Sequence, residues 1–225
     1  MQTVLSGGSS IDVKSTGTLS PSSSDDGISF CGFVSYANNT NVVNGVIETQ
    51  TALDTLISDG YILPVGSAGT YTSNNTAYAA YKDFKFYIKT VNVINVGFKA
   101  TITEPDNKNG IYKATRIALI NSNKTTGLTS DNKYIVQSSV NPAAKIINSV
   151  YTESEGVTTG SYTLVSDAHL ATEFGETSPS VFSVGVDYVT FYLRIWVEGN
   201  DPDCILENEV ISPDLNVSIV FNVVE

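Results

Sequence analysis

The sequence is poor in the residue types from which catalytic and metal sites are most often built. Its 225 residues include one histidine, one tryptophan, one methionine and two cysteines. A catalytic serine or cysteine needs a neighbouring base, and the single histidine, His169, lies in an ordinary amphipathic segment. Zinc needs four ligands at recognisable spacing, which the cysteines and the histidine do not supply. The sequence therefore predicts a protein that is not an enzyme.

Basic residues and long apolar runs are equally scarce. Twelve Lys and Arg stand against 23 Asp and Glu, which gives a net charge of -11. Because nucleic-acid binding depends on cations that neutralise phosphates, no nucleic-acid partner is expected. A run of about 18 apolar residues is missing, so no membrane span is predicted. The first eight residues also lack the basic and apolar regions of an export signal.

Two interpretations fit this N-terminus: a true start at Met1, or a mature form that carries an added methionine. Met1 is the only methionine, although a chain of this length ordinarily contains several. We therefore favour the mature form, and we expect it to be secreted, either extracellular or at the cell surface.

The residues that are abundant favour β-structure. Tyr, Phe, Gly, Ser, Thr and Asn are plentiful, whereas charged residues make up only 16%, a balance that suits strands and turns. The clearest strand covers residues 189 to 197, where apolar and polar side chains alternate with the period of two expected when one face lies in a core. The apolar face carries Val189, Phe191, Leu193, Ile195 and Val197, and the opposite face carries Thr190, Tyr192, Arg194, Trp196 and Glu198.

Similar alternation elsewhere predicts about eight strands and few helices. The predicted fold class is all-β, a jelly-roll-type two-sheet sandwich with a few short helices. Apolar residues at helical spacing predict one helix over residues 46 to 58, ending at Gly60. Residues 142 to 147 and 166 to 171 are each predicted to form one or two further helical turns.

The chain is predicted to divide near residue 27. Residues 1–27 are rich in Ser and Gly and low in bulky side chains, which is typical of a flexible or loosely docked arm. Apolar density rises from Ile28, so residues 28–225 are predicted to form a single domain.

Cys31 and Cys204 are predicted to form a disulfide. Cysteines of exported proteins pass through oxidising compartments, where pairing is common. Closing so long a loop would stabilise the fold by up to about 5 kcal/mol. The alternative is a pair of buried free thiols.

Carboxylates gather directly after the long strand. Oxygen ligands at this density are typical of calcium sites, although the order of residues is not that of an EF-hand. Calcium is the one cofactor that the sequence suggests, and the alternative is a solvated turn stiffened by Pro202. The candidate ligands are Glu198, Asp201, Asp203 and Glu207.

The same region carries a resemblance to a known family. Residues 192 to 204, which include Trp196, Asp201 and Cys204, and the closing strand over residues 215 to 223 resemble the C-terminal end of bacterial secreted proteins related to TasA and camelysin. The resemblance implies an exported jelly-roll protein of a biofilm matrix that polymerises into extracellular fibres. In such fibres an N-terminal segment of one subunit completes the sheet of the next. This chain departs from the family in showing no signal peptide.

The N-terminal residues agree with such an assembly. Val4, Leu5, Ile11 and Val13 are apolar positions in a Ser/Gly-rich segment, which could add as a strand to the open edge of a neighbour's sheet. A head-to-tail contact of this kind does not close, so it builds a homopolymer. The predicted function is a non-catalytic structural subunit of an extracellular filament or biofilm matrix.

Three alternatives remain open from the sequence. The N-terminal segment could be a disordered tail. The protein could instead be a virion coat, tail or decoration protein, which would explain a true start at Met1. It could also be a carbohydrate- or calcium-binding adhesion module, or a glycan-acting enzyme.

Overall fold

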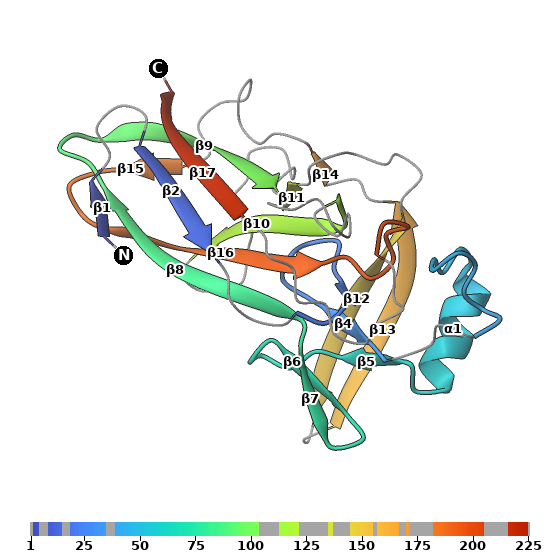
Figure 1. Cartoon of the computed structure of the whole chain (residues 1–225). Coiled ribbons are helices and arrows are strands. Elements are labelled where there is room, and N and C mark those ends of the chain that lie inside the picture. Colours follow the sequence, from blue (N-terminus) through green and yellow to red (C-terminus); the bar gives the residue numbers. More distant parts are fainter. Residues whose placement is uncertain are drawn as a thin grey trace.

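The computed structural model describes most of the chain. The described residues are 2–4, 9–14, 19–34, 39–103, 113–121, 135–136, 145–154, 157–166, 170–171, 182–204 and 216–224. They are arranged mainly in β-strands, with one short α-helix among the described residues (Figure 1). The predicted all-β fold class is therefore confirmed.

Two sheets face one another as a sandwich. The chain passes repeatedly from one sheet to the other, because β8, β9 and β10 alternate between them, as do β15, β16 and β17. This exchange is the arrangement expected of a jelly-roll-type sandwich. The six-stranded sheet has the order β1 (Gln2–Val4), β8 (Tyr81–Lys89), β16 (Val189–Val197), β10 (Thr115–Asn121), β11 (Ile135–Val136) and β14 (Leu170–Ala171), and the four-stranded sheet has the order β15 (Phe182–Val184), β9 (Ile94–Thr103), β17 (Asn216–Val224) and β2 (Ser9–Lys14).

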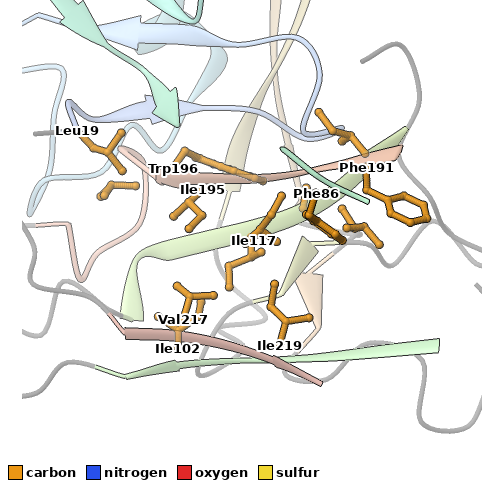
Figure 2. Close-up of a cluster of buried hydrophobic side chains, with 14 of the residues drawn as sticks. Leu19, Phe86, Ile102, Ile117, Phe191, Ile195, Trp196, Val217 and Ile219 are labelled. Atoms are coloured by element: carbon orange, nitrogen blue, oxygen red, sulfur yellow. The ribbon is translucent and has the colours of Figure 1, made fainter. Parts of the chain in front are cut away.

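The main core fills the space between these sheets (Figure 2). Strand β16 supplies its predicted apolar face, of which Phe191, Leu193 and Ile195 are at most 3% exposed. Strand β17 supplies buried side chains from the opposite sheet, among them Val217 and Ile219. Alternate side chains of each strand thus point into a core that lies between the two sheets.

A second, smaller group of elements packs against the far end of the sandwich. Its core contains Cys31, Phe33, Ile47, Leu53, Leu56, Ile62 and Ile147. In Figure 1 the helix α1 lies beside the long β12–β13 hairpin, away from the N-terminus. The elements are the sheet of β3 (Ser22–Ser23), β4 (Cys31–Phe33) and β5 (Ile62–Pro64), the hairpin of β6 (Thr70–Ser73) and β7 (Thr76–Ala79), the hairpin of β12 (Lys145–Ser154) and β13 (Val157–Ser166), and α1 (Gln50–Ser58).

The helix forms where helical spacing predicted it. The side chain of Thr49 caps its first turn by accepting a hydrogen bond from the backbone N–H of Ala52 at 3.2 Å. Leu53 and Leu56 are buried, and Gly60 follows the helix with a φ of 77°, a conformation that glycine adopts without strain. This helix is too short to cross a lipid bilayer, and the described residues contain no longer one.

The two other helical predictions are wrong where the structure describes them. Residues 145 to 147 open the ten-residue strand β12, and residue 166 closes its partner β13. Leu170 and Ala171 form the short strand β14. Residues 142 to 144 and 167 to 169, including His169, lie outside the described residues.

Part of the segment predicted as an N-terminal arm packs against the sandwich. Leu19, Ser20, Ser22, Ser23 and Ser24 are all buried, because this stretch runs beneath the end of β16 and bridges to it through Ser22 and Glu198. Residues 19 to 27 therefore belong to the folded body. Residues 2–4 and 9–14 form β1 and β2 within the sheets of their own chain.

Candidate functional site

The acidic corner, residues 198 to 203, is built around a buried ion pair. Arg116 lies on β10 and donates a hydrogen bond from Nη2 to Oδ2 of Asp201 at 2.8 Å. The two side chains are 1% and 0% exposed. The other carboxylate oxygen of Asp201 accepts from the backbone N–H of Asp203 at 2.8 Å. Protein groups therefore contact both oxygens of Asp201.

The three predicted calcium ligands within the described residues, Glu198, Asp201 and Asp203, do not form a group that could hold a metal ion. Glu198 accepts hydrogen bonds from the indole N–H of Trp196 at 3.4 Å and from the backbone N–H of Asn200 at 3.2 Å. Asp203 lies outward, 3.9 Å from the ammonium of Lys113. No group of three or more potential metal ligands occurs among the described residues, and Glu207 lies outside them. The corner is thus a hydrogen-bonded turn in which residues 198 to 201 are buried, rather than the solvated turn considered from sequence.

The disulfide predicted between Cys31 and Cys204 is not formed, and both residues are free thiols. Cys31 packs in the smaller core and Cys204 packs against the main core, so different groups of side chains hold them. Burial raises the pKa of the Cys31 thiol to about 12, and the nearby carboxylate of Glu198 acts in the same direction. Burial likewise raises the pKa of Cys204. The structure therefore contains the alternative, two buried thiols that stay protonated.

The outer face of β16 is covered at the same end of the sandwich. Trp196 is fully buried and meets the ring of Phe30 edge-on at 5.2 Å between ring centres. Arg194 is 2% exposed and forms a two-pronged ion pair with Asp83, at 2.8 Å and 3.0 Å. Its guanidinium also lies 3.7 Å from the ring centre of Tyr81.

A pocket opens beside this arginine. Its volume is about 390 Å³, and Phe30, Val65, Tyr81, Tyr151 and Arg194 are among the side chains that line it. Small-molecule pockets are commonly this large or larger. However, the guanidinium of Arg194 already donates to Asp83 and to the backbone carbonyl of Gly27. Arg194 therefore lines the pocket together with packed aromatic side chains, and protein groups already accept its hydrogen bonds.

The N-terminal strands occupy one edge of each sheet of the sandwich. Strand β1 pairs in parallel with β8, which places Val4 opposite Lys89. Strand β2 pairs antiparallel with β17, which places Ile11 opposite Ile219 and Val13 opposite Val217. The side chains of Val217 and Ile219 are 2% and 1% exposed, so positions 11 and 13 are aligned with core-facing positions. Leu5 lies outside the described residues.

Sequence reasoning missed the two buried arginines. Arg194 lies on the face of residues 189 to 197 that the alternation assigns to the outside, where a charged side chain is ordinarily solvated, and Arg116 is paired with Trp196 of that strand. Their partners are 85 and 111 residues away in the sequence. The acidic residues that follow β16 were the available signal, but Asp201 among them pairs with Arg116 rather than with a metal ion.

No family model, curated protein or solved structure matches this chain.

Proposed function

We propose that this chain is a non-catalytic structural subunit of an extracellular filament or biofilm matrix, in which copies are joined head-to-tail because each donates its N-terminal strands to the next. The observation that carries the proposal is the position of β1 and β2. One short segment supplies an edge strand to each of the two facing sheets.

An edge strand that completes its own sheet can complete the same sheet in another copy. The slot beside β17 is identical in every molecule, so the backbone pairing of β2 is conserved when the segment comes from a neighbour. Donation to the next copy therefore changes the connectivity and leaves the pairing intact. The edges that it covers would otherwise be open to unspecific pairing.

The apolar positions of the segment favour this assembly. Ile11 and Val13 are aligned with Ile219 and Val217, and directly opposed residues in a sheet share one face. Burial of one such side chain stabilises the sheet by roughly 1.5–3 kcal/mol. The donated strand would thus contribute side-chain burial in addition to backbone hydrogen bonds.

A cysteine pair across β2 and β17 tests the proposal directly. Asp12 and Ser218 are directly opposed in the antiparallel pair, and opposed residues have Cα atoms about 4.5–5.5 Å apart, which is suitable for a disulfide. In Asp12→Cys/Ser218→Cys, oxidation should link the segment to whichever copy holds it. We expect oxidised assemblies to run as covalent ladders in denaturing, non-reducing gels. The single variants Asp12→Cys and Ser218→Cys are the controls.

Deletion of residues 1 to 15 provides a second measurement. We expect the shortened protein to lose polymerisation, as seen by electron microscopy, and a synthetic peptide of residues 1 to 15 to bind it and raise its melting temperature. Oxidised filaments that contain only disulfides within single chains would refute strand donation. A full-length protein that stays monomeric at every concentration and pH would refute the filament itself.

A further inference from the structure

Two turns at one end of the sandwich expose aliphatic side chains to an unusual degree. Residues 90 to 93 join β8 to β9, and residues 185 to 188 join β15 to β16; together they are called the tip. Val91, Val93 and Val186 are 81%, 77% and 64% exposed, and Tyr188 is 48% exposed. They are four of the six large hydrophobic residues that are exposed within the described part of the chain. In Figure 1 both turns lie at the left end of the molecule, opposite α1.

Hydrogen bonds fasten the two turns to each other. The backbone N–H of Thr90 donates to the carbonyl of Gly185 at 2.9 Å, and its hydroxyl donates to the carbonyl of Val184 at 3.1 Å. The same hydroxyl contacts the carbonyl of Asn92 within its own turn. Thr90 is itself 5% exposed. The valines are therefore held out to solvent by an ordered framework, and this limits the ordering entropy lost when a partner covers them.

A belt of tyrosine and lysine side chains continues from Tyr188 of the tip along β8 and β16. Lys89 lies over the ring of Tyr188, with 4.8 Å from Nζ to the ring centre. Lys85 lies 5.3 Å from the ring centre of Tyr87 and 5.9 Å from that of Tyr192. The rings of Tyr87 and Tyr188 meet edge-on at 6.4 Å. These five side chains form one continuous surface from the tip along the outer face of the six-stranded sheet.

The order of these groups points to a lipid bilayer. Aliphatic side chains at the extremity suit the acyl region, and tyrosine suits the boundary with water because its ring is apolar and its hydroxyl polar. Lysine can extend its apolar stem beside the tyrosines and leave the ammonium among the headgroups. We propose that the tip is a membrane-docking site that inserts Val91, Val93 and Val186 into the surface of a bilayer.

A second protein surface fits the tip less well. Stable protein interfaces use about 20–30 residues on each side, far more than the two turns offer. A fluid bilayer needs no complementary shape and accepts side chains from a small tip. The lysines of the belt can pair with lipid phosphates, whereas Asp187 on the tip opposes an anionic surface, as does the net charge of -11. The proposed partner is therefore a bilayer of mainly zwitterionic phospholipid, bound without a spanning segment.

Vesicle flotation with phosphatidylcholine tests this site. We expect full-length protein to float with the vesicles and Val91→Asp/Val93→Asp to lower the partition coefficient at least about tenfold, because two apolar side chains would be replaced by carboxylates. The matched control is Val43→Asp/Val150→Asp, which changes two valines that are 47% and 57% exposed elsewhere on the molecule. This control should float like the parent protein.

A tryptophan at the tip reports insertion separately. In Val186→Trp, the new indole should be quenched by lipids brominated on their acyl chains, whereas the buried native Trp196 should not be. Equal flotation of the tip variant and the parent protein would overturn the proposal, as would a parent protein that binds no vesicles. If the tip variant instead loses self-association in sedimentation velocity while vesicle binding is unchanged, the tip is a contact between copies and not a membrane site. Filament formation is measured independently, so its failure leaves this test intact.

Discussion

Asp201→Asn should destabilise the protein far more than a typical polar substitution. The change keeps the size of the side chain but removes the negative charge that Arg116 contacts at 2.8 Å, with both side chains no more than 1% exposed. The amide would also place an N–H donor where the guanidinium needs an acceptor. Breaking a buried pair by removing one partner costs about 3–5 kcal/mol, which is a large part of the 5–15 kcal/mol that typically separates folded from unfolded proteins.

Urea unfolding followed by the single tryptophan measures this cost. With a slope of about 2–3 kcal/mol per M, the transition midpoint of Asp201→Asn should fall by roughly 1–2.5 M. The neighbouring pair of Lys113 and Asp203 provides the control, since its side chains are 44% and 43% exposed. Exposed pairs contribute about 0–1 kcal/mol, so Asp203→Asn should barely move the midpoint. Equal, small effects of the two variants would show that the buried pair is not the centre of the corner.

Two further predictions concern close packing and the thiols. A Cβ on Gly199 would lie 2.6 Å from the ring of Phe33, so Gly199→Ala should lower the free energy of unfolding in urea by about 1–3 kcal/mol. Adding Phe33→Leu should relieve that cost. The control is Gly60→Ala, where φ is 77° and no atom lies within 4 Å, because it should be destabilised by backbone strain that Phe33→Leu does not relieve. Because burial raises the pKa of the Cys31 thiol to about 12, the unfolded chain releases this proton at a lower pH than the folded chain does. The free energy of unfolding should therefore be unaffected below about pH 8.5. As the pH rises from there towards 12, it should fall by up to about 1.4 kcal/mol per pH unit for each buried thiol. Cys31→Ala should reduce that slope, and a thiol reagent should find no thiols in the native protein and two in urea. No reactive thiol in urea would restore the disulfide prediction.

Alternation along single strands could be predicted from the sequence. The apolar face of β16 was identified correctly because a core on one side imposes a period of two on the side chains. The register could not be predicted, since a shift by two residues preserves the same faces and every alternating strand is an equivalent partner. Strand β16 pairs Leu193 with Phe84 on one side and with Leu119 on the other, a choice made by the whole fold.

Local propensity failed where distant contacts decide the structure. Residues 142 to 147 include two alanines and a lysine, which favour a helix, yet Ile146 and Ile147 lie in β12 and are buried. The antiparallel pairing of β12 with β13 and the packing against the smaller core outweigh that weak preference. In the same way, the partners of Arg116 and Arg194 could not be identified from positions so far apart in the chain.

The valines of the tip show the reverse case. Valine is among the residues most often buried, so sequence reasoning had no basis for placing Val91 and Val93 in solvent. Their exposure results from the turn that joins the two sheets. Thr90 is buried and its hydroxyl donates to the carbonyl of Val184, so the residues that follow it are held on the outside.

The pairing of β2 with β17 has a mechanical consequence. Six successive positions of β2 are opposed to β17, and a pull on the N-terminal segment along its length loads these pairs in shear. Pairs loaded in shear must yield together, whereas pairs pulled at right angles to the strands yield one at a time. The proposed filaments, if this segment joins them, should therefore sustain much higher tension along their axis than the same contact sustains when peeled.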